Sequence, residues 1–332
     1  MVSIFSGVTH TSKSFFQQKH KHMQPGKLLF CLLLLSCRII DSYSQLPTLA
    51  AGKLIRHENF HSAFVTPRHV DVWLPDDYRP KKKYAVLYMH DGQMLFDSSS
   101  TWNKQEWGVD ETMSGLLQQK KIRNCIIVGI WNGGKYRHTD YFPQQPFESL
   151  TQQEQDTLYY AKRTNGQAIF QGQKVRSDAY LSFLVSELKP FIDSVYATRK
   201  CRKSTFIAGS SMGGLISLYA LCEYPEVFGG AACLSTHWPG TFTLENNPVP
   251  DAFIAYLQKK LPTARKNKIY FDTGDAELDA LYPPLQKRVD AVLQDKGFSA
   301  KNWMTLYFPG AGHNEQAWKE RLQQPLLFLL GR

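Results

Sequence analysis

The positions of apolar residues along the chain predict buried strands that alternate with helices. Nearly continuous apolar runs are typical of strands buried on both faces of a parallel sheet. We expect such strands at 84–89, 125–130, 205–208, 230–234, 268–271 and 303–308, with an earlier strand at 70–75. Helices are expected at 109–119, 180–196, 214–224, 283–296 and 315–330. The alternation predicts one α/β domain with a mostly parallel sheet and helices on both faces.

The segment 133–172 departs from this pattern. It is rich in Gln, Tyr, Gly and Thr and has no regular apolar period. We therefore expect it to be an insertion above the sheet rather than part of the strand and helix alternation.

The N-terminal part of the chain has the layout of a secretory signal. A short apolar run at 28–36 follows several lysines, and it is far shorter than the roughly 20 apolar residues of a membrane-spanning helix. We expect residues 1–44 to be a signal peptide and leader, and 45–332 to be a single secreted or periplasmic domain without a stable membrane span. Lipid attachment at Cys37 is the alternative.

Charge and cysteine content narrow the partners and cofactors. The chain has 39 Lys and Arg against 29 Asp and Glu. Five of the basic residues and one of the acidic ones lie in 1–44, so the net charge of +10 falls to +6 without that segment. The remaining basic residues are scattered, and nucleic-acid binding is not indicated. No cysteine or histidine spacing typical of zinc occurs, so a zinc site is not indicated.

The candidate nucleophile lies in the segment Gly209-Ser210-Ser211-Met212-Gly213, which fits the pattern G-x-S-x-G. The segment falls between a predicted strand and a predicted apolar helix, which is where a nucleophile elbow occurs. In such a turn the central serine projects its hydroxyl above the sheet, at a helix N-terminus that favours negative charge. This context predicts that Ser211 is catalytic.

A serine hydroxyl needs a base to become a good nucleophile. Only His237 and His313 follow Ser211 in the chain. His313 lies in a glycine-rich loop between the last predicted strand and the last predicted helix, which is where this fold places its base. His237 comes too early for that role, and we expect it to line the pocket with Trp238 or to be an ordinary polar residue.

The acid that orients the base should follow the strand at 268–271. The loop after this strand offers four carboxylates, of which Asp272 is expected to end the strand. Spacing alone leaves Asp275, Glu277 and Asp279 as candidates.

An acyl-transfer site also needs hydrogen-bond donors for the oxyanion. We expect one to be the backbone N–H of Met212, directly after the nucleophile. The second should come from the loop that follows the strand at 84–89, where the backbone N–H of Gly92 or Gln93 is suitably placed.

Taken together, these residues resemble the esterase family that includes esterase D, enterochelin esterases, feruloyl and acetyl-xylan esterases, and the mycolyltransferases of the antigen 85 type. The matching segments lie at 90–97, 107–111, 129–132, 209–213, 270–274 and 312–315. The resemblance implies an α/β-hydrolase fold and a serine acyl-enzyme mechanism without cofactor or metal. It also narrows the acid to Glu277 or Asp279, and both residues fit the family pattern.

The expected substrate is an acylated carbohydrate or a similar small ester. Aromatic residues near the predicted catalytic loops suit sugar rings, although they equally suit a core; those expected to contact substrate are Trp131 and Trp238, beside His237. The alternatives are an acyltransferase, a siderophore esterase of the enterochelin type, and a non-catalytic module that binds carbohydrate or a partner. The sequence indicates no oligomeric state.

Overall fold

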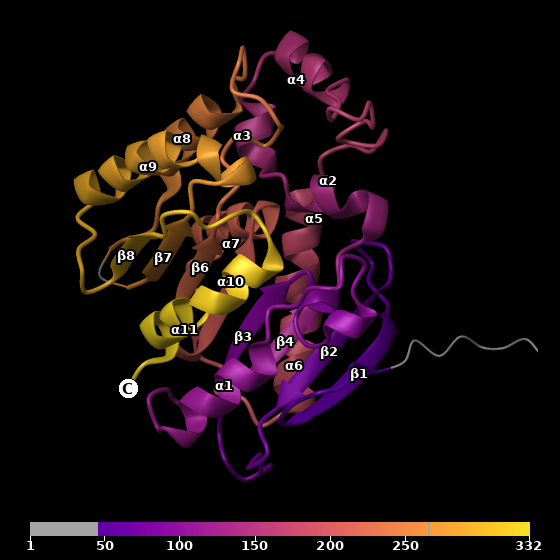
Figure 1. The fold of residues 1–332 in the computed structure, drawn as a ribbon, viewed down its shortest axis with the longest axis vertical. Coiled ribbons are helices and arrows are strands. Elements are labelled where there is room, and N and C mark those ends of the chain that lie inside the picture. The colour runs from indigo at the N-terminus through magenta and orange to yellow at the C-terminus, as the bar shows by residue number, and fades with distance from the viewer. Residues whose placement is uncertain (1–45, 265) are drawn as a thin grey trace, which may run out of the picture. The chain divides into compact units, whose positions relative to one another are not determined.

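The computed structural model describes residues 46–264 and 266–332. The described residues form one compact unit (Figure 1). The predicted signal segment 1–44, and with it Cys37, lies outside the described residues. Within the described part of the chain, no helix is long and apolar enough to cross a membrane.

The core of the molecule is an eight-stranded sheet with the strand order β1-β2-β4-β3-β5-β6-β7-β8. The first two strands are antiparallel to their neighbours, and the other six are mutually parallel. This arrangement is that of the α/β-hydrolases, as predicted. The strands are β1 (Lys53–Phe60), β2 (Arg68–Leu74), β3 (Ala85–His90), β4 (Cys125–Ile130), β5 (Thr205–Ser210), β6 (Gly230–Leu234), β7 (Lys268–Thr273) and β8 (Trp303–Tyr307).

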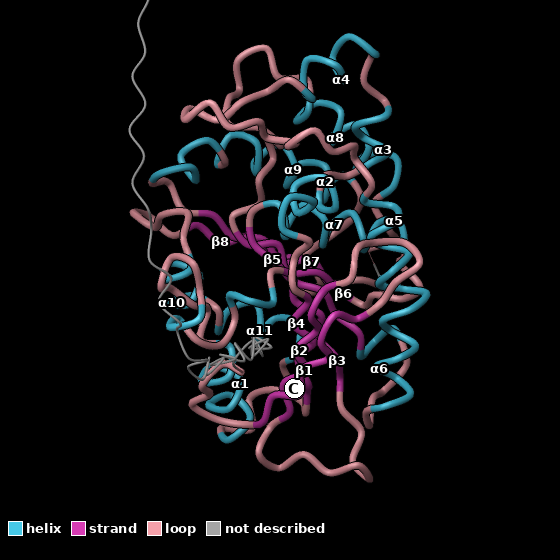
Figure 2. The backbone as a smooth tube through the Cα atoms, turned by 90° about the vertical axis from the view of Figure 1, so that its right-hand side faces the viewer, coloured by secondary structure: helices cyan, strands magenta, loops and turns pink. Residues whose placement is uncertain are grey.

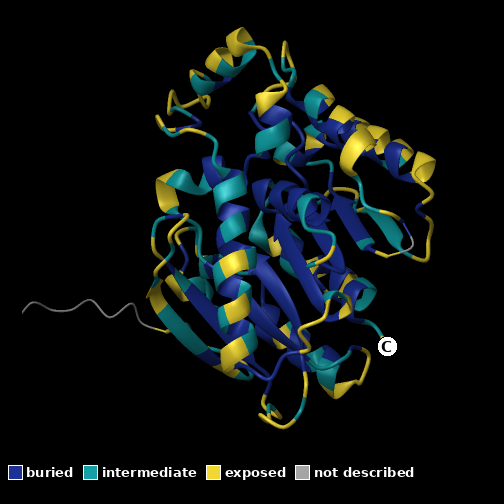
Figure 3. Cartoon of the chain, turned by 180° about the vertical axis from the view of Figure 1, so that it is seen from behind, coloured by how far each residue is buried: buried dark blue, intermediate teal, exposed yellow. Residues whose placement is uncertain are grey.

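Helices cover both faces of the sheet (Figures 1 and 2). On one face the apolar sides of α1, α10 and α11 pack against alternate strand residues; the other face is covered mainly by α5 to α9. Figure 3 shows buried strands behind helices whose outer sides are exposed. The helices are α1 (Val109–Gln118), α2 (Arg137–Tyr141), α3 (Gln144–Glu148), α4 (Gln152–Tyr159), α5 (Ser177–Ser182), α6 (Lys189–Val195), α7 (Met212–Glu223), α8 (Val249–Lys260), α9 (Pro283–Asp295), α10 (Glu315–Arg321) and α11 (Gln323–Leu330).

Several local features differ from the pattern read from the sequence. The expected helix at 315–330 is divided into α10 and α11, because Pro325 has no N–H to donate to the carbonyl of Arg321. The expected helix at 180–196 contains a π-helical turn, Phe183–Leu188, between α5 and α6. The insertion at 133–172 includes the short helices α2 to α4, and β1 and α8 were not anticipated.

The parallel strands place their carboxyl ends at one edge of the sheet. The loops after β3, β5, β6, β7 and β8 therefore meet there. These loops carry the segments in which the sequence predicts chemistry, so the fold brings residues from five separate stretches of chain to one place. In open α/β sheets this edge is the usual position of a binding site.

Candidate active site

Ser211 lies at a sharp turn between β5 and α7. Its backbone has φ 57° and ψ −125°, a conformation that is unfavourable for a residue with a side chain and is typical of a strained functional turn. Small neighbours make the turn possible. A Cβ atom on Gly209 would lie 2.7 Å from the carbonyl carbon of Gly213, so a larger residue there would force strand and helix apart.

A row of hydrogen bonds connects Ser211, His313 and Asp279. The Ser211 Oγ lies 2.9 Å from His313 Nε2, and His313 Nδ1 lies 2.6 Å from Asp279 Oδ1. Because an ionised carboxylate only accepts hydrogen bonds, Nδ1 carries the imidazole proton and Nε2 is free to accept from the serine hydroxyl. This is the arrangement that general-base activation of a serine requires.

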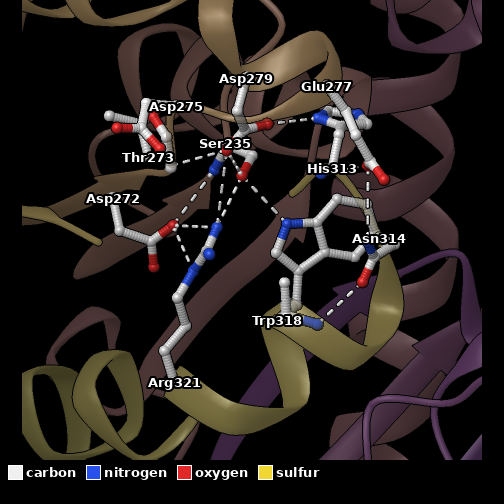
Figure 4. Close-up of polar contacts among 12 residues, drawn as sticks. Ser235, Asp272, Thr273, Asp275, Glu277, Asp279, His313, Asn314, Trp318 and Arg321 are labelled. Atoms are coloured by element: carbon white, nitrogen blue, oxygen red, sulfur yellow. Dashed lines mark hydrogen bonds and ion pairs between the residues drawn. The ribbon is translucent and has the colours of Figure 1, made fainter. Parts of the chain in front are cut away.

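Asp279 is held in position by the turn that carries it. It belongs to the 3₁₀ turn Glu277–Leu281, after β7, and its side chain is fully buried. Its second oxygen accepts hydrogen bonds from the Gly274 N–H at 2.7 Å and from the Ser235 hydroxyl at 2.6 Å (Figure 4). The carboxylate is therefore fixed on one side by its own loop and on the other by the loop after β6.

The other two acidic candidates contact the backbone of the histidine loop instead of the ring. Glu277 accepts a hydrogen bond from the His313 backbone N–H at 2.8 Å. Asp275 accepts one from the Gly310 N–H at 2.6 Å. Both carboxylates hold the loop in place, and neither is bonded to an imidazole nitrogen.

A buried cation behind Asp279 was not anticipated from the sequence. The Arg321 guanidinium donates to the Ser235 hydroxyl at 2.7 Å and forms an ion pair with Asp272 at 3.1 Å (Figure 4). Trp318 donates to the same hydroxyl through Nε1 at 3.0 Å. Ser235 thus accepts two hydrogen bonds and donates its single proton to Asp279. The available signal was the i, i+3 spacing of Trp318 and Arg321, which places both on one helix face.

The backbone N–H groups expected to bind the oxyanion belong to two turns beside Ser211. Met212 is the first residue of α7, and the N–H of a first helical residue has no acceptor within its helix. Gly92 and Gln93 lie in the 3₁₀ turn Gly92–Met94 after β3. A Cβ on Gly92 would lie 2.5 Å from the carbonyl carbon of Gly129, so glycine lets this turn pack directly on β4.

The turn that carries Gly92 is anchored through Asp91. The Arg137 guanidinium binds the Asp91 carboxylate with two hydrogen bonds of 2.7 and 2.8 Å, and the Asn132 side-chain amide donates a third at 2.7 Å. Burial alone would raise the pKa of Asp91, but Arg137 and Asn132 outweigh it and lower that pKa. Gln93 in turn accepts from the Asn132 backbone N–H at 3.2 Å.

These groups open into a cleft of about 670 Å³. Of the residues expected to bind substrate, His237 lines this cleft. The structure does not place the two tryptophans there. Trp238 packs in the core against Phe253 and Phe271, and Trp131 donates to Asp71 through Nε1 at 2.8 Å. The tryptophans that line the cleft are Trp102, Trp107 and Trp318.

Each tryptophan is held away from the cleft by its own contacts. Trp131 directly follows β4 and lies next to the antiparallel edge strands. The Arg56 guanidinium carbon lies 4.7 Å from the centre of the Trp131 ring. Trp238 is only 2% exposed, and its indole N–H donates a hydrogen bond to Gln286.

Among the described residues, no group of three or more His, Cys, Asp and Glu side chains could hold a metal ion.

Comparison with known proteins identifies the family. The model of the family described as "Putative esterase" matches residues 62–329. The chain belongs to this esterase family. The esterase is accordingly a carboxylic-ester hydrolase, as the sequence motifs predict.

Curated relatives of the esterase are distant. An uncharacterised protein of Bacillus subtilis, YjcH, is 24% identical over 63% of this chain and 67% of its own length. An endo-1,4-beta-xylanase/feruloyl esterase of Xylanibacter ruminicola is 25% identical over 76% of this chain. The matched part is only 28% of that relative's length.

Solved structures share the fold at similarly low identity. A ferulic acid esterase superposes with a TM-score of 0.58 at 18% identity, covering 84% of this chain and 98% of the other. The enterobactin esterase FES of Shigella flexneri gives a TM-score of 0.58 at 17% identity, covering 86% of this chain and 60% of the other. These likenesses support the α/β-hydrolase architecture.

Proposed function

We propose that the esterase hydrolyses its substrates through a covalent acyl-enzyme formed on Ser211. The observation that carries this proposal is the row of hydrogen bonds from Ser211 through His313 to Asp279. His313 takes the hydroxyl proton as Ser211 Oγ attacks the ester carbonyl, and then gives the proton to the departing alcohol. Water activated by the same imidazole attacks the acyl-enzyme and releases the acid and the free serine.

The negative charge of each tetrahedral intermediate is stabilised by backbone donors. The N–H of Met212 and that of Gly92 or Gln93 are the proposed pair. Removing one such donor typically costs a factor of about 10² to 10³ in kcat. Asp279 stabilises the imidazolium that forms during each step and keeps His313 in the productive tautomer.

The proposed substrate class is an acylated carbohydrate, and the proposed location is outside the cytoplasm. Support for the substrate comes from the feruloyl esterase named among the relatives and from Trp102, which lines the cleft and is 83% exposed. An exposed indole face beside a reactive serine suits the apolar face of a sugar ring.

The proposed export of the esterase is supported by the apolar run at 28–36, which follows several lysines.

A fluorophosphonate probe tests the nucleophile directly. We expect the wild-type esterase to be labelled, Ser211→Ala to lose labelling and ester hydrolysis, and Ser210→Ala to retain labelling. Ser210 is the matched control because it is the adjacent serine of the same turn. Labelling that survives in Ser211→Ala and disappears in Ser210→Ala would contradict the assignment.

A hydrolysis panel tests the substrate class. Acetylated xylan, feruloylated arabinose, simple p-nitrophenyl esters and a catechol-serine trilactone should be compared by kcat/KM. We expect the two sugar esters to be hydrolysed most efficiently. A preference for the trilactone would replace the carbohydrate proposal with a siderophore esterase, and sugar-ester synthesis that outpaces hydrolysis would replace it with an acyltransferase.

A further inference from the structure

Ser235 presents a buried hydroxyl to Asp279 from the end of a neighbouring strand, and the mechanism proposed above does not use it. The residue directly follows β6, is fully buried and has a backbone φ of 40°. A positive φ is uncommon for a residue other than glycine, and such strained positions gather at functional sites, where the surrounding contacts fix them. Ser211, at the end of the adjacent strand β5, is the other strained serine of this region, with φ 57°.

The contacts of the Ser235 hydroxyl leave one direction for its proton. The Arg321 guanidinium and the Trp318 indole donate to the hydroxyl oxygen at 2.7 and 3.0 Å. These two donors occupy both lone pairs of the oxygen, so the proton points to Asp279 Oδ2, 2.6 Å away (Figure 4). Ser235 is therefore held as a donor to the carboxylate.

The Asp279 side chain does not by itself fix the plane of its carboxylate. The last torsion of an aspartate is broad and roughly two-fold, so the hydrogen bonds on Oδ2 decide how Oδ1 meets His313 Nδ1. One donor to Oδ2 is the Gly274 N–H, which belongs to the same loop as Asp279. The other is Ser235, whose hydroxyl ties the carboxylate to a different strand of the sheet.

The same contact relates the acid to the nucleophile. Leu234, the residue before Ser235, accepts a hydrogen bond from the Ser211 backbone N–H at 2.9 Å. With the bonds from Ser211 to His313 and from His313 to Asp279, this closes a ring of contacts that begins and ends at the nucleophile. The position of the acid is thus tied to the pairing of β5 with β6.

Arg321 can orient the Ser235 hydroxyl because charge fixes its own position. The guanidinium is 3% exposed and forms ion pairs with Asp272 at 3.1 Å and with Asp279 at 3.8 Å. A buried charge without a partner is costly, so these two carboxylates keep the guanidinium beside Ser235. Asp272 also accepts a hydrogen bond from the Ser235 backbone N–H at 3.3 Å, which holds the cation and the serine together.

Resting on the proposed hydrolysis at Ser211, we propose that Ser235 is a positioning residue for the reaction and that Arg321 orients it. The Ser235 hydroxyl holds the Asp279 carboxylate in the plane in which it accepts from His313 Nδ1. Because Ser235 is fully buried, it reaches the reacting atoms through Asp279. Its loss should therefore slow the chemical steps without weakening the binding of substrate.

Ser235→Ala and Ser235→Gly test the hydroxyl. Both variants remove it, and glycine also relieves the positive φ, so the hydrogen bond and the backbone strain are separated. We expect each variant to lower kcat for p-nitrophenyl acetate about tenfold, as for the loss of a hydrogen bond to a charged group, while KM does not rise. Ser177→Ala is the control, because Ser177 is also fully buried but its hydroxyl accepts from the Gln144 N–H at 2.9 Å; its kcat should not change.

A double-mutant cycle asks whether Ser235 acts through Asp279. The rate of fluorophosphonate labelling is compared in Ser235→Ala, Asp279→Ala and the double variant, because labelling is read on the protein itself even when turnover is very slow. We expect the double variant to be labelled at the rate of Asp279→Ala within about twofold, since the carboxylate on which Ser235 acts is already gone. A further loss in the double variant, as large as that in Ser235→Ala alone, would show independent action and overturn the proposal.

Arg321→Lys and Arg321→Met test the orienting cation, and they decide the question if the Ser235 variants fail to fold. Lysine keeps a positive charge and an N–H donor, whereas methionine has neither. We expect kcat to fall in both variants, less in Arg321→Lys, with KM close to that of the wild type. An unchanged kcat in folded Arg321→Met overturns the orienting role.

The outcomes separate failure of the positioning role from failure of the proposed function. A wild-type esterase that is labelled by fluorophosphonate, with kcat unchanged in both Ser235 variants, overturns the positioning role alone. A loss in Ser235→Ala that is absent in Ser235→Gly overturns it too, since backbone strain would then explain the loss. A folded wild type that is not labelled overturns hydrolysis at Ser211, and the positioning role with it.

Discussion

Asp275, Glu277 and Asp279 belong to one loop, but each carboxylate binds a different group of the loop that carries His313. Asp279 binds the imidazole Nδ1, Glu277 binds a backbone N–H, and Asp275 binds another one further along. A carboxylate on Nδ1 fixes the tautomer and stabilises the imidazolium. A carboxylate on a backbone N–H only restrains the loop, so substitution should affect the rate very differently at the three positions.

Asp279→Asn should lower kcat by a factor of about 10⁴. An amide can turn an N–H toward Nδ1, which forces the proton onto Nε2 and prevents that nitrogen from accepting the serine proton. The matched variant Glu277→Gln keeps an oxygen that accepts from the His313 backbone N–H, and its kcat should fall far less. Hydrolysis of p-nitrophenyl acetate measures both. A greater loss in Glu277→Gln would assign the acid to Glu277.

At the scale of elements, the site depends on two loops that pack tightly against each other at Gly274. A Cβ on Gly274, after β7, would lie 1.9 Å from the Ala311 carbonyl oxygen in the loop after β8. The same oxygen accepts from the N–H groups of Asp275 and Ala276 at 3.2 Å. This contact sets the distance between the acid loop and the histidine loop.

Gly274→Ala should therefore destabilise the fold by about 1–3 kcal/mol and lower kcat, since separating the loops lengthens the bond between Asp279 and His313. Gly115→Ala is the control. Gly115 lies in α1, where an added methyl group would have nothing within 4 Å, and alanine there should stabilise by about 0.4–1 kcal/mol. Urea unfolding and kcat measure both variants, and equal effects would refute the role of the loop contact.

At the scale of the whole molecule, buried carboxyl groups make stability depend on pH. Asp110, at the start of α1, accepts backbone N–H bonds from Ala50 at 2.7 Å and Ala51 at 3.3 Å. Burial, helped by the neighbouring Glu111, raises its pKa to about 7. Burial also raises the pKa of Asp272 to about 6, against the opposing effect of Arg321.

A raised carboxyl pKa means that folding takes up a proton. In the unfolded chain an aspartate has a pKa of about 3.9, so the stabilisation from Asp110 is complete below that pH and is lost as pH rises through about 7. The free energy of unfolding should fall between pH 5 and pH 8. Asp110→Asn, whose amide oxygen still accepts from Ala50, should reduce this fall without removing the part due to Asp272. Urea unfolding at the two pH values measures it, and an unchanged slope would contradict the prediction.

The sequence by itself determined the features that depend on neighbouring residues. Apolar periods predicted the alternating α/β architecture, and the family comparison and the structure confirm it. The position of Ser211 followed from glycines on either side of a strand-to-helix turn, because steric space at such a turn is a local property. His313 followed from chain order within the fold, since the last strand and last helix must have a loop between them.

Only the tertiary structure decided which distant side chains meet. Three acidic residues lie within the six positions after β7, and the turn Glu277–Leu281 directs Asp279 to the imidazole. Ser235 and Arg321 are 86 residues apart and meet because β6 and β7 are adjacent strands and α10 lies against their carboxyl ends. Trp131 and Trp238 were expected in the cleft and lie outside it. Whether an aromatic residue near a catalytic loop lines the cleft or packs elsewhere depends on tertiary contacts, which the local sequence pattern does not contain.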